Sequence, residues 1–206
     1  MKSAIEKLSG VLPIAADGRE ADAAIVTSPD NRRYLTGFPS SDGVVVITAQ
    51  QSYFLTDFRY FEAAQKQVKN CRVEELTRLE DSLSEIVRRH GIKNVLMENA
   101  SLTLAEAGAY RRILRGCGAD TVEDTTLDRL IRGLRAIKAP QEIQKIKDAQ
   151  KITDDSFTHI LPFLREGATE REIALEIEFY MRKSGADGVS FDLIVVSGAN
   201  GSLCHG

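Results

Sequence analysis

Short β-branched runs alternate with helical patterns through residues 1–134, and this alternation is the feature that most limits the possible folds. The runs Gly43–Thr48 and Tyr53–Thr56 predict a β-hairpin across the turn Ala49-Gln50-Gln51. Further strands are predicted over residues 23–27, 72–75, 95–97 and 120–122, with helices over residues 58–69, 79–90, 104–115 and 127–135. Ser28–Asn31 is predicted as a turn that closes the first of these strands. Paired strands followed by strand–helix repeats predict an α/β domain with a mixed sheet and flanking helices.

The pattern changes near residue 138. Pro140 is well placed to begin a helix, and helical periodicity continues to Phe163. A capping-box pattern of Thr169 and Glu172 predicts the start of a second helix. The apolar run Phe191–Val196 predicts a buried strand. Two helices and one strand do not make a complete core, so we expect this second domain to be truncated in the chain.

The first candidate for a catalytic residue lies at the end of the chain. A Gly-rich turn follows the predicted strand and leads to His205, whose side chain can transfer a proton at neutral pH. A strand that delivers a histidine through such a turn is a common way to build a site. We therefore expect the groups that work with His205 to lie outside these residues.

Composition narrows the class of protein. The net charge of −3 argues against a nucleic-acid partner or an anionic membrane surface. Three cysteines, widely spaced, fit a reducing compartment and form no zinc-binding spacing. The first residues do not form a signal peptide, and no apolar run approaches the roughly 20 residues that span a bilayer. We expect a cytoplasmic protein with no nucleic-acid partner and no membrane partner.

Several longer segments, in the same order, resemble one protein family. They are NRRYLTGFPSSDGVVVIT (31–48), YFLTDFRYFEAA (53–64), RAIKAPQEIQKIKDAQKITDDSF (135–157) and REGATEREIALEIEFYMRKSGADGVSFDLIVVSGANGSLCHG (165–206). These segments resemble the Xaa-Pro aminopeptidases and prolidases, the pita-bread metallopeptidases that also include the creatinases. The resemblance implies a creatinase-like N-terminal domain over residues 1–134. It also implies the start of a pita-bread catalytic domain over residues 135–206.

The resemblance implies metal-dependent hydrolysis of peptide bonds that precede proline. In this family two divalent metals, manganese or cobalt, are held by two Asp, one His and two Glu that follow the segment of His205. No residue of this chain matches those ligands, so we expect the chain alone to be inactive. His205 is implied to lie beside the metal centre, where it positions substrate and shuttles a proton. The family also implies a homodimer. Two alternatives stay open, a creatinase-like amidinohydrolase and a non-catalytic pita-bread interaction module.

Other residues are weaker candidates for a site. Arg59 follows a strand end, and N-terminal-domain loops in this family can border the active site of the partner subunit. This implies a substrate-binding role for Arg59, with a structural ion pair as the alternative. The loop Gly37–Asp42 is a second candidate for the border of the partner's active site. His90 ends a predicted helix, where a partly cationic ring would suit the helix dipole, so we expect a structural role for it rather than a site. Cys204 stands where the family often has proline, and we expect it to pack as a small apolar residue rather than act as a nucleophile.

Overall fold

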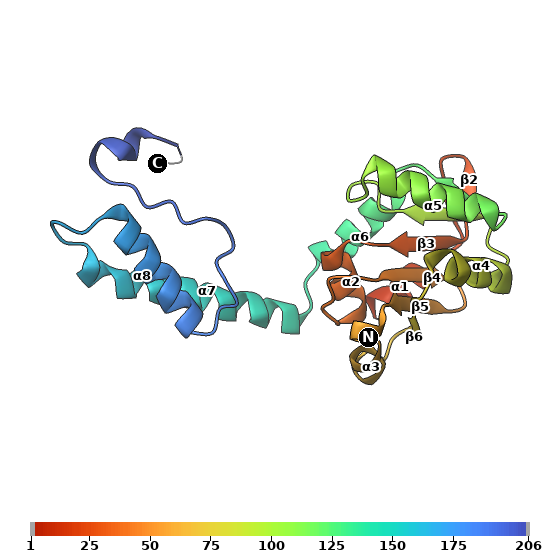
Figure 1. The fold of residues 1–206 in the computed structure, drawn as a ribbon, viewed down its shortest axis with the longest axis horizontal. Coiled ribbons are helices and arrows are strands. Elements are labelled where there is room, and N and C mark those ends of the chain that lie inside the picture. Colours follow the sequence, from red (N-terminus) through yellow and green to blue (C-terminus); the bar gives the residue numbers. More distant parts are fainter. Residues whose placement is uncertain (1–2, 205–206) are drawn as a thin grey trace. The chain divides into compact units, whose positions relative to one another are not determined.

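The computed structural model describes residues 3–204. The chain forms two compact units, Met1–Ile137 and Lys138–Gly206 (Figure 1). Each unit is described by itself. No helix among the described residues is long and apolar enough to cross a membrane.

A six-stranded sheet forms the centre of the first unit, with the strand order β6-β5-β4-β3-β7-β8. The hairpin predicted from the sequence is confirmed, because β4 (Val44–Thr48) pairs antiparallel with β5 (Ser52–Thr56). β4 also pairs antiparallel with β3 (Ala23–Val26). The other neighbours are parallel: β5 with β6 (Arg72–Glu75), β3 with β7 (Asn94–Met97), and β7 with β8 (Asp120–Val122). The mixed sheet is therefore confirmed.

Helices cover both faces of this sheet (Figure 1). On one face lie α1 (Ala4–Ser9), α2 (Pro29–Thr36), α3 (Phe58–Gln67) and α6 (Thr126–Ala136). On the other face lie α4 (Leu79–His90) and α5 (Leu104–Gly116). Successive residues of β3 point to opposite faces, so Ala24 and Val26 join the first core while Ala23 and Ile25 join the second. This burial on both faces explains why the strand is apolar throughout.

Two parts of the first unit differ from the sequence prediction. The turn predicted at Ser28–Asn31 is wrong, because helix α2 begins at Pro29 and Ser28 occupies its N-cap position. Turns and helix starts use the same residue types, and proline is favoured in the first helical turn. A small hairpin of β1 (Ile14–Ala16) and β2 (Arg19–Ala21) was not predicted.

The second unit contains two long helices, α7 (Pro140–Ile160) and α8 (Glu170–Lys183), with a 3-10 turn at Leu161–Phe163. The capping box is confirmed, because the Thr169 hydroxyl accepts from the Glu172 N–H and the Glu172 carboxylate accepts from the Thr169 N–H. The strand predicted at Phe191–Val196 is wrong, since these residues form no ladder. A β-branched run favours an extended backbone but supplies no pairing partner.

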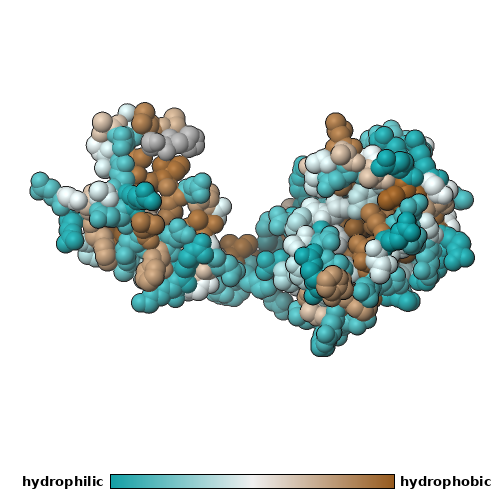
Figure 2. Space-filling view, viewed as in Figure 1, coloured by the Kyte–Doolittle hydropathy of each residue, from teal (hydrophilic) through white to brown (hydrophobic). Residues whose placement is uncertain are grey.

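Much of the apolar surface of the second unit faces solvent. Only Ser156, Ile160 and Ile173 are buried among its described residues. Phe191 is 73% exposed and Ile194 is 51% exposed. Hydrophobic residues accordingly appear on the surface of this unit in the space-filling view (Figure 2). The described part of this unit therefore has little core of its own.

Candidate functional site

Arg59 and Asp57 form an ion pair at the carboxyl end of β5. Asp57 is the N-cap of α3, and its carboxylate accepts from the backbone N–H of Arg59 at 2.9 Å. The same carboxylate accepts from Arg59 Nε at 2.9 Å and from Nη2 at 2.5 Å. These bonds lower the pKa of Asp57 and raise the pKa of Arg59. The Arg59 side chain is still 54% exposed, and its Nη1 lies outside this pair, so the guanidinium is oriented and accessible.

The loop Gly37–Asp42 lies beside this pair. Gly37 ends α2 with φ of 74°, a left-handed conformation that favours glycine. Phe38 is buried and packs against the rings of Phe54 and Tyr60 at centroid distances of 6.1 and 6.3 Å. The Arg59 guanidinium lies 5.4 Å from the centroid of the Tyr60 ring. The structure therefore brings the two N-terminal candidate segments of the sequence into one polar surface.

Arg32 lies on the inner side of this loop and was missed by the sequence analysis. It is 4% exposed. Its Nη1 donates to the carbonyls of Thr27 and Gly43, the latter at 2.9 Å, and its Nη2 donates to the carbonyl of Ser40 at 2.9 Å. No local pattern predicts such burial, because an arginine within a helix is usually exposed.

A buried carboxylate stands at the carboxyl ends of β3 and β7. Glu98 is 1% exposed. It accepts from the N–H groups of Thr27 and Ser28 at 2.5 and 2.8 Å, from the Ser28 hydroxyl at 2.7 Å, and from the Asn31 amide at 2.6 Å. The carboxylate thereby satisfies donors at the N-terminal end of α2, where a negative charge is favoured. Glu98 has a structural explanation and needs no ligand.

The two described histidines also have structural partners. His90 Nε2 lies 2.7 Å from the Tyr53 hydroxyl. Burial and then the nearby Arg89 lower the pKa of His90. His159 Nε2 lies 2.7 Å from Glu176 Oε1, and the ring stacks on Tyr180 with centroids 4.2 Å apart. These contacts join α7 to α8 in the second unit.

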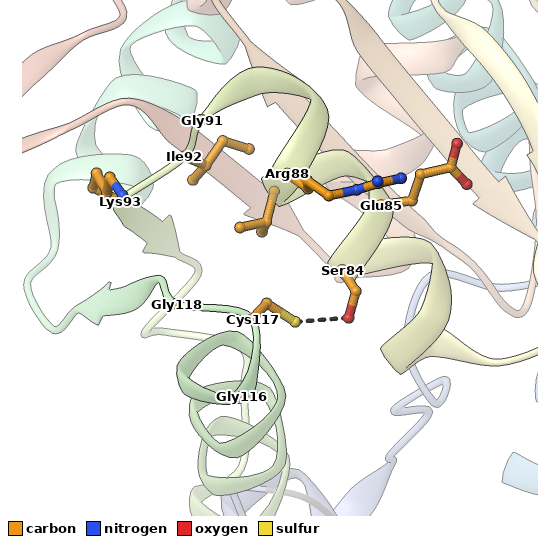
Figure 3. Close-up of a pocket in the computed structure, with 10 residues that line it drawn as sticks. Ser84, Glu85, Arg88, Gly91, Ile92, Lys93, Gly116, Cys117 and Gly118 are labelled. Carbon is orange, nitrogen blue, oxygen red and sulfur yellow. Dashed lines mark hydrogen bonds between the residues drawn. The ribbon is translucent and has the colours of Figure 1, made fainter.

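A surface pocket of about 490 Å³ lies where α4 and α5 end (Figure 3). Ser84 and Cys117 line it and are in direct contact, with Oγ and Sγ 2.8 Å apart. Arg88 and Lys93 also line it. Cationic side chains suit the carbonyl ends of two helices. Within residues 3–204 neither the hydroxyl nor the thiol is paired with a base, so the described pocket lacks the arrangement that nucleophilic catalysis requires.

His205 lies outside the described residues, so its role stays a prediction. Cys204 is exposed, and the expectation that it packs as an apolar residue is therefore wrong for this chain. Between residues 3 and 204, no group of three or more His, Cys, Asp or Glu side chains could hold a metal ion. This part of the chain does not fit a dinuclear metal centre.

Comparison with known proteins covers both units. The Creatinase/Prolidase N-terminal domain matches residues 14–137, and Metallopeptidase family M24 matches residues 144–206. The uncharacterized peptidase YqhT of Bacillus subtilis is 40% identical over 186 residues, which cover 90% of this chain and 51% of that protein. A putative Xaa-Pro aminopeptidase of Mycoplasma pneumoniae is 31% identical over 205 residues, covering 100% of this chain and 55% of that protein.

Solved structures agree with these matches. The Xaa-Pro dipeptidase from Bacillus anthracis superposes with a TM-score of 0.81 at 34% identity, covering 92% of this chain and 51% of that chain. The prolidase from Pyrococcus horikoshii gives a TM-score of 0.79 at 26% identity, covering 98% of this chain and 55% of that chain. The chain thus spans about half the length of the relatives it matches. The chain belongs to the creatinase/prolidase family, with the N-terminal domain of that family followed by a segment of metallopeptidase family M24.

Proposed function

We propose that the whole protein is a metal-dependent peptidase that hydrolyses peptide bonds preceding proline. The observation that carries this proposal is the match to family M24 over residues 144–206, directly after a creatinase/prolidase N-terminal domain. The relatives found by sequence include a putative Xaa-Pro aminopeptidase and an Xaa-Pro dipeptidase, and a solved structure that superposes on this chain is an Xaa-Pro dipeptidase. Proline-containing peptides are therefore the proposed substrates, and the cytoplasm is the proposed location.

Two residues of this chain take part in the proposed reaction. His205 positions the substrate and moves a proton at the reacting centre. Arg59 binds substrate from the N-terminal domain, which we place at the active site of the partner subunit in a homodimer. The exposed, oriented guanidinium supports this role, because a fixed cation loses little entropy when it binds a carboxylate or carbonyl oxygen.

The two divalent metals of the proposed enzyme, manganese or cobalt, would supply an activated water as the nucleophile. The described residues of this chain do not form their site. We therefore propose that the polypeptide of residues 1–206 does not cleave Xaa-Pro peptides and binds no catalytic metal pair. Residues 1–134 would form the creatinase-like domain and residues 135–206 the first part of the catalytic domain.

The test uses the whole gene product beside the 206-residue chain. Each is assayed with manganese or cobalt on an Xaa-Pro dipeptide, a longer Xaa-Pro peptide and matched Xaa-Ala peptides. We expect the whole protein to cleave only the proline peptides and to lose this activity with a chelator. We expect the 206-residue chain to show no turnover and no stoichiometric metal by elemental analysis.

Other outcomes would replace the proposal. Creatine is assayed in parallel, and its turnover in the presence of a chelator would identify an amidinohydrolase. Absence of turnover by a folded whole protein on all of these compounds would favour a non-catalytic interaction module. Chelator-sensitive turnover by the 206-residue chain would contradict its proposed inactivity.

A further inference from the structure

One side chain holds the backbone of residues 39–43, the part of the loop after α2 that leads into β4. The Arg32 guanidinium donates to the carbonyl of Ser40 near the start of this loop and to the carbonyl of Gly43 at its end. It also donates to the carbonyl of Thr27, the residue after β3. A single planar group thus joins a strand end to both ends of the loop. The rigid fork of arginine suits such bridging, which the single ammonium group of lysine cannot reproduce.

Burial of the Arg32 cation costs free energy, so a specific role must offset this cost. A buried cation loses its hydration and is tolerated only where hydrogen bonds and negative charges replace it. Three carbonyls accept from Arg32, and the nearby carboxylates of Asp42 and Glu98 partly offset the effect of burial. Arg32 Nε still has no partner among the described residues. An apolar side chain could be buried at this position of α2 at a lower cost in free energy. We therefore attribute the arginine to its hydrogen bonds, which fix the geometry of the loop.

The far end of the loop is equally restricted. Gly43 has φ of 126°, a conformation that side chains rarely adopt. A Cβ at this position would lie 2.8 Å from the Leu55 carbonyl oxygen and 2.8 Å from the Phe54 ring. The loop therefore enters β4 along one path, and Arg32 fixes its course between α2 and β4.

The outer side of the same loop faces the proposed substrate-binding surface. The Ser41 hydroxyl lies 2.8 Å from the Tyr60 hydroxyl, and Tyr60 follows Arg59 in α3. The Asp42 carboxylate accepts from the Gly43 N–H at 2.7 Å, which turns this side chain back onto its own backbone. A shift of the loop would consequently displace the groups beside Arg59.

We propose that Arg32 is a positioning residue for the peptidase reaction, because its buried guanidinium sets the path of the loop Pro39–Gly43 beside Arg59. This inference rests on the proposed function. Arg32 touches no substrate; it acts through the loop, and its loss should weaken substrate binding rather than slow the chemical step.

The test uses the whole protein with manganese and three variants. Arg32→Met removes the cation, Arg32→Lys keeps the charge without the fork, and Arg33→Met changes the neighbouring exposed arginine as a matched control. We expect Arg32→Met to raise KM for Xaa-Pro peptides by roughly tenfold with kcat nearly unchanged, because only binding is lost. Arg32→Lys should give an intermediate KM, and Arg33→Met should match the wild type. Backbone amides of residues 40–43 should exchange hydrogen faster in both Arg32 variants.

If Arg32→Met does not fold, the Arg32→Lys variant decides the outcome. Faster exchange in residues 40–43 with an unchanged KM would overturn the positioning role, and so would unchanged exchange. An equal fall in kcat and kcat/KM would point to a transition-state role instead and would also overturn it. A wild-type protein that cleaves no Xaa-Pro peptide would remove the proposed function itself, while the exchange data would still show whether Arg32 holds the loop.

Discussion

The Tyr60 hydroxyl lies 2.8 Å from the Ser41 hydroxyl, and this contact joins two segments that are 19 residues apart in the chain. One segment is the loop that follows α2, and the other begins α3. Each is, from the sequence alone, a separate candidate for the border of an active site. The two segments form one surface, because Ser41 contacts Tyr60 and the Arg59 guanidinium lies over the Tyr60 ring.

The first prediction concerns Arg59 in the whole protein. Replacement by alanine should raise KM for Xaa-Pro peptides by roughly fivefold, because a guanidinium that binds substrate is lost. The fold should persist, since the Asp57 carboxylate still accepts from the backbone N–H of residue 59 and caps α3. Steady-state kinetics with dipeptide and longer substrates would measure the effect.

Arg78→Ala is the matched control for this experiment. Arg78 also forms an exposed ion pair with a residue three positions along the chain, Asp81, but it lies at the start of α4. A KM that changes equally in both variants would count against a specific role for Arg59. An unchanged KM in Arg59→Ala would leave only the structural ion pair.

The second prediction concerns the pH dependence of stability. The pKa of His90 is lowered from its ordinary value of 6.5 by burial and by Arg89. The unfolded chain therefore binds a proton at this residue at a higher pH than the folded chain does. The stability linked to neutral His90 is complete above pH 6.5 and falls as the pH drops from there toward the folded pKa.

The His90→Gln variant isolates this contribution. Urea unfolding of the first unit, followed by circular dichroism, should be compared for both proteins between about pH 5.5 and 7.5, on either side of the ordinary histidine pKa. The stability difference between wild type and variant should shrink as the pH falls. A difference that grows at low pH would show that the folded protein prefers the charged ring.

Local patterns predicted most of the first unit. The β4–β5 hairpin needed only two β-branched runs and a short connection, and it formed with Val44 opposite Leu55. The strand Arg72–Glu75 and the helix Leu79–His90 have the bounds expected from the sequence. By contrast, Phe191–Val196 has the composition of a strand without the partner that a strand requires. Pairing is a tertiary property, and composition alone does not supply it.

The candidate site was likewise predictable only in part, where its contacts are local in the sequence. The ion pair between Asp57 and Arg59 is local, because the two residues are two positions apart at a helix start. The burial of Arg32 depends on carbonyls 8 and 11 residues further along the chain, which reach its guanidinium because the loop after α2 folds back over the helix. The sequence shows an arginine within a helix and contains no sign of its burial.

The third prediction concerns the unequal cores of the two units. Limited proteolysis of the 206-residue chain with trypsin should cut first at or beyond Lys138, because the described part of the second unit buries only three residues. Exposed sites such as Arg88 and Arg112 in the first unit should survive longer, since their helices pack on the sheet. Early cleavage between residues 20 and 130 with a surviving C-terminal part would contradict this prediction.

The fourth prediction concerns self-association of the 206-residue chain. A strand at Phe191–Val196 would offer an unpaired edge to a second copy, but the structure contains no strand there and has exposed apolar side chains instead. On α7 and α8, Phe157, Leu175 and Phe179 are 67%, 57% and 63% exposed. Exposed apolar side chains of this size favour contact with a second copy, because burial removes them from water.

Light scattering over a concentration series should therefore show a rising mean mass for the 206-residue chain. Phe179→Lys should reduce this rise, because a charge would enter the contact between copies. Leu104→Lys provides the control, since Leu104 is 94% exposed on a helix of the first unit and should leave the rise unchanged. Equal effects of the two substitutions would indicate a general change in solubility. A monomer at every concentration would mean that this apolar surface does not drive association, and the homodimer of the whole protein would then need another interface.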